Sequence, residues 1–163
     1  MDTRIIKTKF WQDEKVQSLT IEAKLLFVYF ITCPHIGKTG IFEIADSYIL
    51  LETGLTKEQL TKAKKELENK KRAFFFGNWV YVVKALKHTR YDIGIKTSVG
   101  FKKELENLPK KVVDYYINLK DSSIDKSDTT IVEYIKHKTQ TINNKQQNIE
   151  AKEDEVFNIL SSK

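Results

Sequence analysis

The side chains that could do chemistry in this sequence are mainly lysines, and they are dense between Lys57 and Arg72, where seven basic residues meet three acidic ones. A helix over this stretch would turn Leu60, Ala63 and Leu67 inward, because apolar residues three and four apart share one face. The outward positions then hold ammonium, hydroxyl and amide groups, which bond phosphates and base edges. The candidate nucleic-acid contacts are Thr56, Lys57, Gln59, Thr61, Lys62, Lys65, Lys71 and Arg72.

The same stretch also fits an ordinary solvated helix. Glu58 precedes Lys62 by four residues and Glu66 precedes Lys70 by four, a spacing that places opposite charges side by side on any exposed helix. The charge pattern therefore leaves two interpretations open, a nucleic-acid contact and a surface that only keeps the protein in solution.

A cluster of aromatic side chains follows the lysine-rich stretch. Two β-rich runs, AFFF and WVYVV, flank Gly77-Asn78, which is a strong signal for a two-residue hairpin. Side chains alternate between the two faces of a strand, so the rings cannot all point into one core. We expect the C-terminal helices to cover the outer rings, or these rings to form a subunit interface or stack on nucleic acid. The candidate interface residues are Phe74, Phe76, Trp79 and Tyr81.

Catalytic and metal-binding arrangements are weak in this sequence. His35, His88 and His137 have no metal-ligand spacing with Cys33. The GKTG segment at 37–40 resembles half of a phosphate-binding loop, but it lacks the earlier glycine and the Lys-Ser/Thr ending, which favours a simple turn. No serine nucleophile motif is found. We therefore expect no metal, no cofactor and no enzymatic activity.

The elements that would position the lysine-rich stretch form a helix-turn-helix. Asp46 or Ser47 would cap a first helix, and Gly54 ends it, since glycine tolerates the left-handed conformation found at helix C-termini. Thr56 would cap the second helix, which continues to about Arg72. The hairpin follows this second helix directly, as the wing of a winged helix does.

The neighbouring segments complete this fold. Thr20 would cap the helix IEAKLLFVYFIT, which is apolar almost all round and should be the central, buried one. The segment IFEI after Gly40 is a short strand candidate, and 93–119 reads as two helices separated at Pro109. The predicted fold class is mainly α with a small β-hairpin, a winged helix-turn-helix followed by two packing helices.

Charge separates the chain into two parts near residue 120. Residues 1–120 hold 22 Lys and Arg against 14 Asp and Glu, a net charge of +8, whereas 121–163 carry −2. We expect 1–120 to be a winged-helix DNA-binding domain with its packing helices, and 121–163 to be a polar linker with the start of a second helical segment. A basic folded part favours a polyanionic partner, with nucleic acid as the leading candidate.

Cysteine usage and hydropathy point to the cytoplasm. Cys33 is the single cysteine, which excludes an intrachain disulfide and is typical of a reducing compartment. The N-terminus MDTRIIKTKF lacks the apolar stretch of a signal peptide, and the longest apolar run, Leu25 to Ile31, is too short to span a bilayer. We expect a cytoplasmic protein that does not bind membranes.

Several of these segments, taken in order, carry a family resemblance. The segments FWQDEKVQSLTIEAKLLFVYFITCPH, GIFEI, ETGLTKEQL and GNWVYVVKALKH resemble the N-terminal domain of phage replication-initiation proteins, or replisome organisers, which are similar in plan to DnaD-like primosomal proteins. Lys64 departs from the pattern, because that position is usually apolar, and we expect its stem to pack while the ammonium reaches solvent. The resemblance covers about 4–119, and its matching positions are Trp11, Asp13, Leu19, Lys24, Leu25, Tyr29, Pro34, Gly40, Gly54, Leu55 and Trp79.

The resemblance implies a phage or prophage replication-initiation protein that binds double-stranded origin DNA through a winged helix. It also implies recruitment of a helicase loader or another replisome protein. A single winged helix with mostly lysine contacts discriminates poorly between sites, so we expect a homo-oligomer whose copies act together. Two alternatives stay open, an adaptor or inhibitor that binds a host replication or defence protein, and a winged-helix transcriptional regulator.

Overall fold

A computed structural model describes residues 4–85 and 99–123, which belong to one compact unit of the chain, Met1–Asp125. This part is mainly helical and contains one small three-stranded antiparallel sheet. The predicted second helical segment, and most of the predicted polar linker before it, lie outside the described residues, as does the start of the helical region predicted from residue 93.

Three helices open the chain, η1 (Thr8–Gln12), α1 (Glu14–Gln17) and α2 (Ile21–Thr32). The hydroxyl of Thr20 accepts a hydrogen bond from the Ala23 amide, which confirms Thr20 as the cap of α2. α2 lies at the centre of the core, where its buried residues are Ala23, Leu26, Phe27, Phe30 and Ile31.

The prediction that α2 is the central, buried helix is confirmed, but one edge of the helix faces solvent. Ile21 and Leu25, one turn apart on α2, face solvent, and Ile21 keeps 81% of its surface exposed. Because both faces of this helix are apolar, the sequence has no polar stripe that marks the outward side.

The next two helices, α3 (Asp46–Thr53) and α4 (Lys57–Asn69), are joined by a short turn. Gly54 adopts a φ of 71°, in the left-handed region that a side chain makes costly, and this lets the chain reverse between the helices. Thr56 and Gln59 then form a reciprocal capping box at the start of α4. These features confirm the predicted turn and the Thr56 cap. The cap predicted for α3 at Asp46 or Ser47 is wrong, because Ala45 holds the N-cap position and no side chain caps this helix.

α4 ends at Asn69, before the predicted end at Arg72. Lys71 takes a φ of 53° and donates its amide to the Glu68 carbonyl at 2.9 Å, while the Arg72 amide reaches back to the Leu67 carbonyl at 2.7 Å. This is the hydrogen-bond pattern of a Schellman turn, which satisfies the last carbonyls of a helix. Glycine usually signals such a turn, and here a lysine occupies its left-handed position.

The sheet consists of β1 (Ile41–Glu43), β2 (Ala73–Phe76) and β3 (Trp79–Val82). β3 lies in the middle and pairs antiparallel with both other strands. Gly77, with a φ of 58°, opens the two-residue turn between β2 and β3, so the predicted hairpin is confirmed.

The pairing register decides which rings face which side of the sheet. One cross-strand row carries Ile41, Phe74 and Tyr81, which all point away from α2. The adjacent row points to the opposite face, into the core formed with α2 and α4, and it comprises Phe42, Phe75 and Val80.

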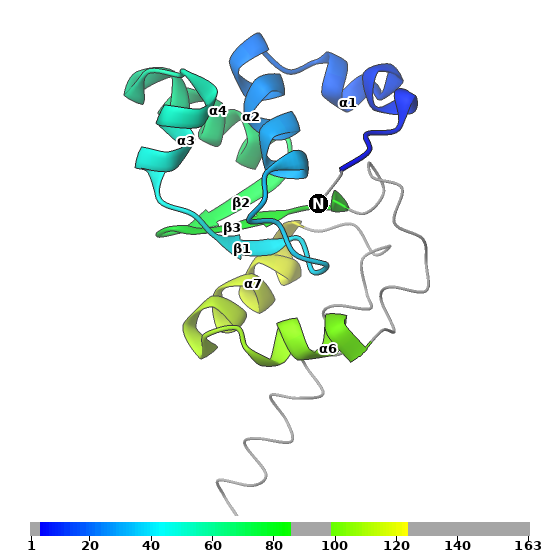
Figure 1. The fold of residues 1–163 in the computed structure, drawn as a ribbon, viewed down its shortest axis with the longest axis vertical. Helices are drawn as coiled ribbons and strands as arrows, with labels where there is room; N and C mark the ends of the chain where they lie inside the picture. The colour runs from blue at the N-terminus through cyan, green and yellow to red at the C-terminus, as the bar shows by residue number, and fades with distance from the viewer. Residues whose placement is uncertain (1–3, 86–98, 124–163) are drawn as a thin grey trace, which may run out of the picture. The chain divides into compact units, whose positions relative to one another are not determined.

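The C-terminal helices α6 (Val99–Glu106) and α7 (Lys110–Ser123) follow, and α7 covers the outer face of the sheet. The sheet therefore lies between α7 on one side and α2, α3 and α4 on the other (Figure 1). Val112 and Tyr116 of α7 are buried there, and the Tyr116 ring lies 5.4 Å from the ring of Tyr81. The prediction that C-terminal helices cover the aromatic face is confirmed.

A carboxylate joins α6 to the loop before β1. One oxygen of Glu104 accepts hydrogen bonds from the backbone amides of Lys38, at 2.7 Å, and Thr39, at 3.1 Å. A Cβ on Gly37 would lie 2.5 Å from this oxygen, and a Cβ on Gly100 would lie 2.5 Å from the Lys38 ammonium. Gly37 thus leaves room for the Glu104 carboxylate of α6, and Gly100 of α6 leaves room for the Lys38 ammonium. We call these contacts the Glu104 clasp.

Candidate nucleic-acid interface

The exposed face of α4 carries three lysines, Lys57, Lys62 and Lys65, which we call the α4 basic face. The apolar residues of α4 occupy the buried side, so these ammonium groups point to solvent. Lys62 pairs with Glu58, with 2.8 Å between Nζ and Oε1, whereas Lys57 and Lys65 form no ion pair among the described residues. Three ammonium groups on one exposed helix surface can donate hydrogen bonds to phosphate oxygens.

Both flanks of α4 are fixed to neighbouring elements. The Lys64 ammonium pairs with the Asp46 carboxylate of α3 and lies 5.1 Å from the centre of the Phe75 ring. The Lys64 side chain thus packs along the core, as predicted. Its ammonium group, which was expected to reach solvent, pairs with a carboxylate. Glu66 accepts hydrogen bonds from the amide of Thr20, at 2.9 Å, and from its hydroxyl, at 2.6 Å. The orientation of the α4 basic face is therefore set by the rest of the fold.

The side chain of Gln59, a predicted contact, is engaged within the chain. Its side-chain oxygen accepts from the Thr56 amide at 2.9 Å, and its side-chain nitrogen donates to the Glu22 carboxylate at 3.4 Å. The oxygen and the nitrogen of this half-buried amide thus bond the start of α4 and the α2 residue Glu22.

Three other predicted contacts lie on the surface around α4. Thr56 caps the helix, and Thr61 donates its hydroxyl to the Lys57 carbonyl at 2.9 Å, so both hydroxyls already serve the helix. Lys71 is exposed just beyond the end of α4. The structure thus gathers Thr56, Lys57, Thr61, Lys62, Lys65 and Lys71 on and around one helix.

Arg72 is buried, and its prediction as a contact is corrected. Only 6% of its surface is exposed, and its Nε has no hydrogen-bond partner among the described residues. Burial lowers the pKa of Arg72, and the negative charge of Asp13 partly opposes this shift. The Schellman turn brings this residue onto the base of the hairpin, where its carbonyl accepts from the Val83 amide at 2.9 Å.

The predicted aromatic interface residues mostly face the chain itself. Phe74 and Tyr81 are buried beneath α7, which contradicts their prediction as contacts to another molecule. Trp79 is half-buried against the same cluster. Phe76 is partly exposed, but its ring stacks on Tyr115 of α7 with 4.7 Å between centroids.

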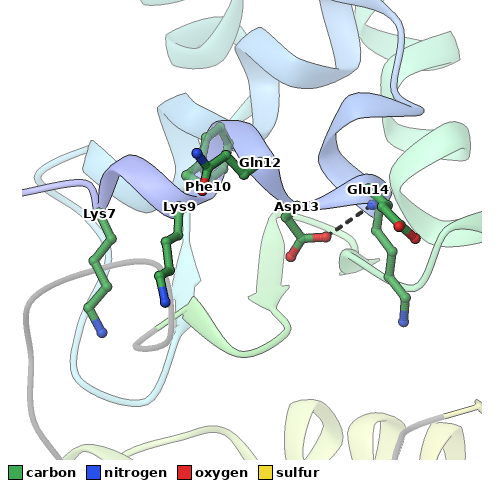
Figure 2. Close-up of a pocket in the computed structure, with 7 residues that line it drawn as sticks. Lys7, Lys9, Phe10, Gln12, Asp13 and Glu14 are labelled. Carbon is green, nitrogen blue, oxygen red and sulfur yellow. Dashed lines mark hydrogen bonds between the residues drawn. The ribbon is translucent and has the colours of Figure 1, made fainter.

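A second group of lysines, which the sequence interpretation did not select, borders a surface hollow beside η1 and α1. Figure 2 shows Lys7, just before η1, and Lys9 of η1 extending in the same direction, away from the helix. Asp13 and Glu14 also line this hollow, so its charge is mixed. The hollow can hold a polar or anionic group, but it concentrates less positive charge than the α4 basic face.

The described part of the chain has neither a metal-binding cluster nor a membrane-spanning helix. Residues 4–85 and 99–123 contain no group of three His, Cys, Asp or Glu side chains that could hold a metal ion. Burial raises the pKa of the Cys33 thiol, which disfavours its reactive thiolate form. Within the same residues, no helix combines the length and apolar character that crossing a membrane requires.

Comparison with protein-family models, with curated proteins and with solved structures found no match to this chain.

Proposed function

We propose that this protein binds double-stranded DNA through the α4 basic face, as a winged-helix domain that initiates DNA replication. The observation that carries the proposal is the exposed trio of Lys57, Lys62 and Lys65 on the second helix of a tight helix–turn–helix. A helix of this kind fits the major groove, and its lysines neutralise phosphates along the groove edges.

The order of elements supports a winged helix. α2, β1, α3, α4, β2 and β3 follow one another as the helices and strands of such a domain do, and the β2–β3 hairpin stands where a wing stands. The hairpin turn, Gly77-Asn78, carries no cation. The α4 basic face therefore provides the main electrostatic contact in this proposal.

The replication role and its partners rest on the sequence resemblance to phage replisome organisers. On this basis the protein binds origin DNA as a homo-oligomer and recruits a helicase loader or another replisome protein. A transcriptional regulator would use the same surface, and a footprint on the source genome separates an origin from a promoter.

The test is a salt titration of binding to a labelled duplex. If about three lysines, Lys57, Lys65 and Lys71, neutralise phosphates, the logarithm of the affinity falls with the logarithm of salt at a slope of roughly −3. Lys65→Gln should reduce this slope by about one, whereas Lys103→Gln on α6, away from α4, should not. Absence of binding to any duplex at low salt contradicts the proposal.

A second function, binding to another protein, is favoured by exposed apolar side chains on two adjoining helices. Ile21 and Leu25 of α2, and Tyr48 and Leu51 of α3, are all exposed, and Leu51 keeps 80% of its surface. The Tyr29 hydroxyl donates to a Glu52 oxygen at 2.8 Å, which ties these two helices together. A protein that co-purifies with a partner but shifts no duplex in a gel would favour this function over DNA binding.

A further inference from the structure

Glu58 is the acidic residue of the exposed α4 surface, and it stands in the first turn. The two other carboxylates of α4 are half-buried on its flanks, where Glu66 holds Thr20 and Glu68 lies against the backbone of Phe75. The side chains of Glu58 and Lys62 are 78% and 76% exposed and lie 2.8 Å apart. They present a negative acceptor and a positive donor side by side at the end of the helix that enters a groove first.

We propose that Glu58 and Lys62 together read one G·C base pair in the major groove. This inference rests on the proposed function and names the sequence that the α4 face selects. Guanine presents two adjacent acceptors, N7 and O6, and the amino group of its cytosine partner is the next group along the edge. Lys62 can donate to the guanine acceptors while Glu58 accepts from the cytosine amino group.

The other polar side chains near the start of α4 already bond groups of the same chain, so they are less suited to contact bases than Glu58 and Lys62. The Gln59 amide is held by Thr56 and Glu22, and the Thr61 hydroxyl donates to the Lys57 carbonyl. Lys57 and Lys65 carry charge without a neighbouring acceptor of their own, which suits phosphates. Near the start of α4, direct reading of bases therefore depends on Glu58 and Lys62.

An A·T pair fits the two side chains less well. Its groove edge alternates acceptor, donor and acceptor, and it ends in the thymine methyl group. Lys62 would find no two adjacent acceptors there, and the methyl group would crowd a charged neighbour. A carboxylate that faces DNA without a donor is repelled by the phosphates, so Glu58 penalises sites that lack the cytosine amino group.

The experiment measures binding of the full chain to duplexes. A randomised duplex pool is selected for binding, and the selected site is then tested with each G·C pair changed to A·T. The wild type should lose roughly ten-fold in affinity at one such pair. Glu58→Gln should reduce this preference to less than about three-fold or turn it towards A·T, because glutamine pairs with adenine. Lys62→Gln should reduce it as well.

Lys65→Gln is the matched control on the same helix face. It should weaken binding to all duplexes by a similar factor and keep the G·C preference. Circular dichroism checks that each variant keeps its helix content. Equal binding of the wild type to all duplexes, or an unchanged preference in Glu58→Gln, contradicts recognition of a G·C pair by Glu58 and Lys62. Neither result contradicts DNA binding by the α4 basic face. Absence of duplex binding overturns both proposals.

Discussion

At the scale of single residues, polar side chains that suit nucleic acid also hold this fold together. Gln59, Lys64 and Glu66 all belong to the charged and polar set of α4, yet each bonds another element of the same chain. Their contacts span long stretches of sequence, so spacing along a helix could not reveal them. The residues left for a partner are those whose only neighbours are solvent or the adjacent turn.

Lys71 provides a prediction at this scale. Its φ of 53° is costly for a residue with a Cβ, and glycine removes that cost. Lys71→Gly should raise the free energy of unfolding by roughly 0.5 kcal/mol, after the greater entropy of glycine in the unfolded chain is subtracted. Under the proposed function the same change should weaken DNA binding, because it removes a cation beside α4.

The neighbouring lysine is the matched control for this prediction. Lys70 has a φ of −83°, an ordinary value, so Lys70→Gly should lower stability. Urea unfolding of both variants measures the difference. If the two variants shift the midpoint in the same direction, the conformational argument for Lys71 fails.

At the scale of elements, α6 depends on the Glu104 clasp. A charged carboxylate that accepts from two backbone amides is worth more than a neutral acceptor in the same place. Glu104→Gln should lower the free energy of unfolding by about 1–2 kcal/mol. Chemical denaturation measures this effect, and Glu43→Gln at the exposed end of β1 is the control, for which we expect no comparable change. Equal effects of both substitutions would argue against the clasp.

The elements were more predictable than their contacts. Gly54, Thr56 and the Gly77-Asn78 turn were identified because each acts on its immediate neighbours. The sequence predicts an end of α4 beyond the observed one, because Lys71 holds the left-handed position at which glycine is the usual signal. Arg72 was assigned to the surface because its charge favours solvent, whereas the turn before β2 directs it inward.

At the scale of the whole molecule, burial makes the protein sensitive to alkaline pH. Burial raises the pKa of Tyr116, Tyr29 and Cys33, with the Glu52 carboxylate adding to the shift at Tyr29. Each group stays neutral in the folded chain at a pH where the unfolded chain ionises it. The stability that this neutral form provides is present in full below the unfolded pKa and is lost as the pH rises above it.

The free energy of unfolding should therefore decline above about pH 9, where unfolded cysteine and then tyrosine lose their protons. Tyr116→Phe is the matched variant, since it removes a buried hydroxyl that has no hydrogen-bond partner among the described residues. It should flatten the decline between about pH 9 and 11, and it should not destabilise the protein at pH 7. Urea unfolding across this range tests the prediction, and parallel curves for the two proteins would refute it.

The covering of the sheet by α7 has a consequence for the newly synthesised chain. The hairpin can close within about 1–10 μs once Val83 has emerged, yet α7 is complete only about 40 residues later, at Ser123. At about 5–20 residues per second, roughly 2–8 s of synthesis separate the two events. During this interval the row of Ile41, Phe74 and Tyr81 lacks the cover that α7 provides. If translation stalls after Val83 but before Ser123, the sheet exposes this apolar face, which can aggregate with other chains.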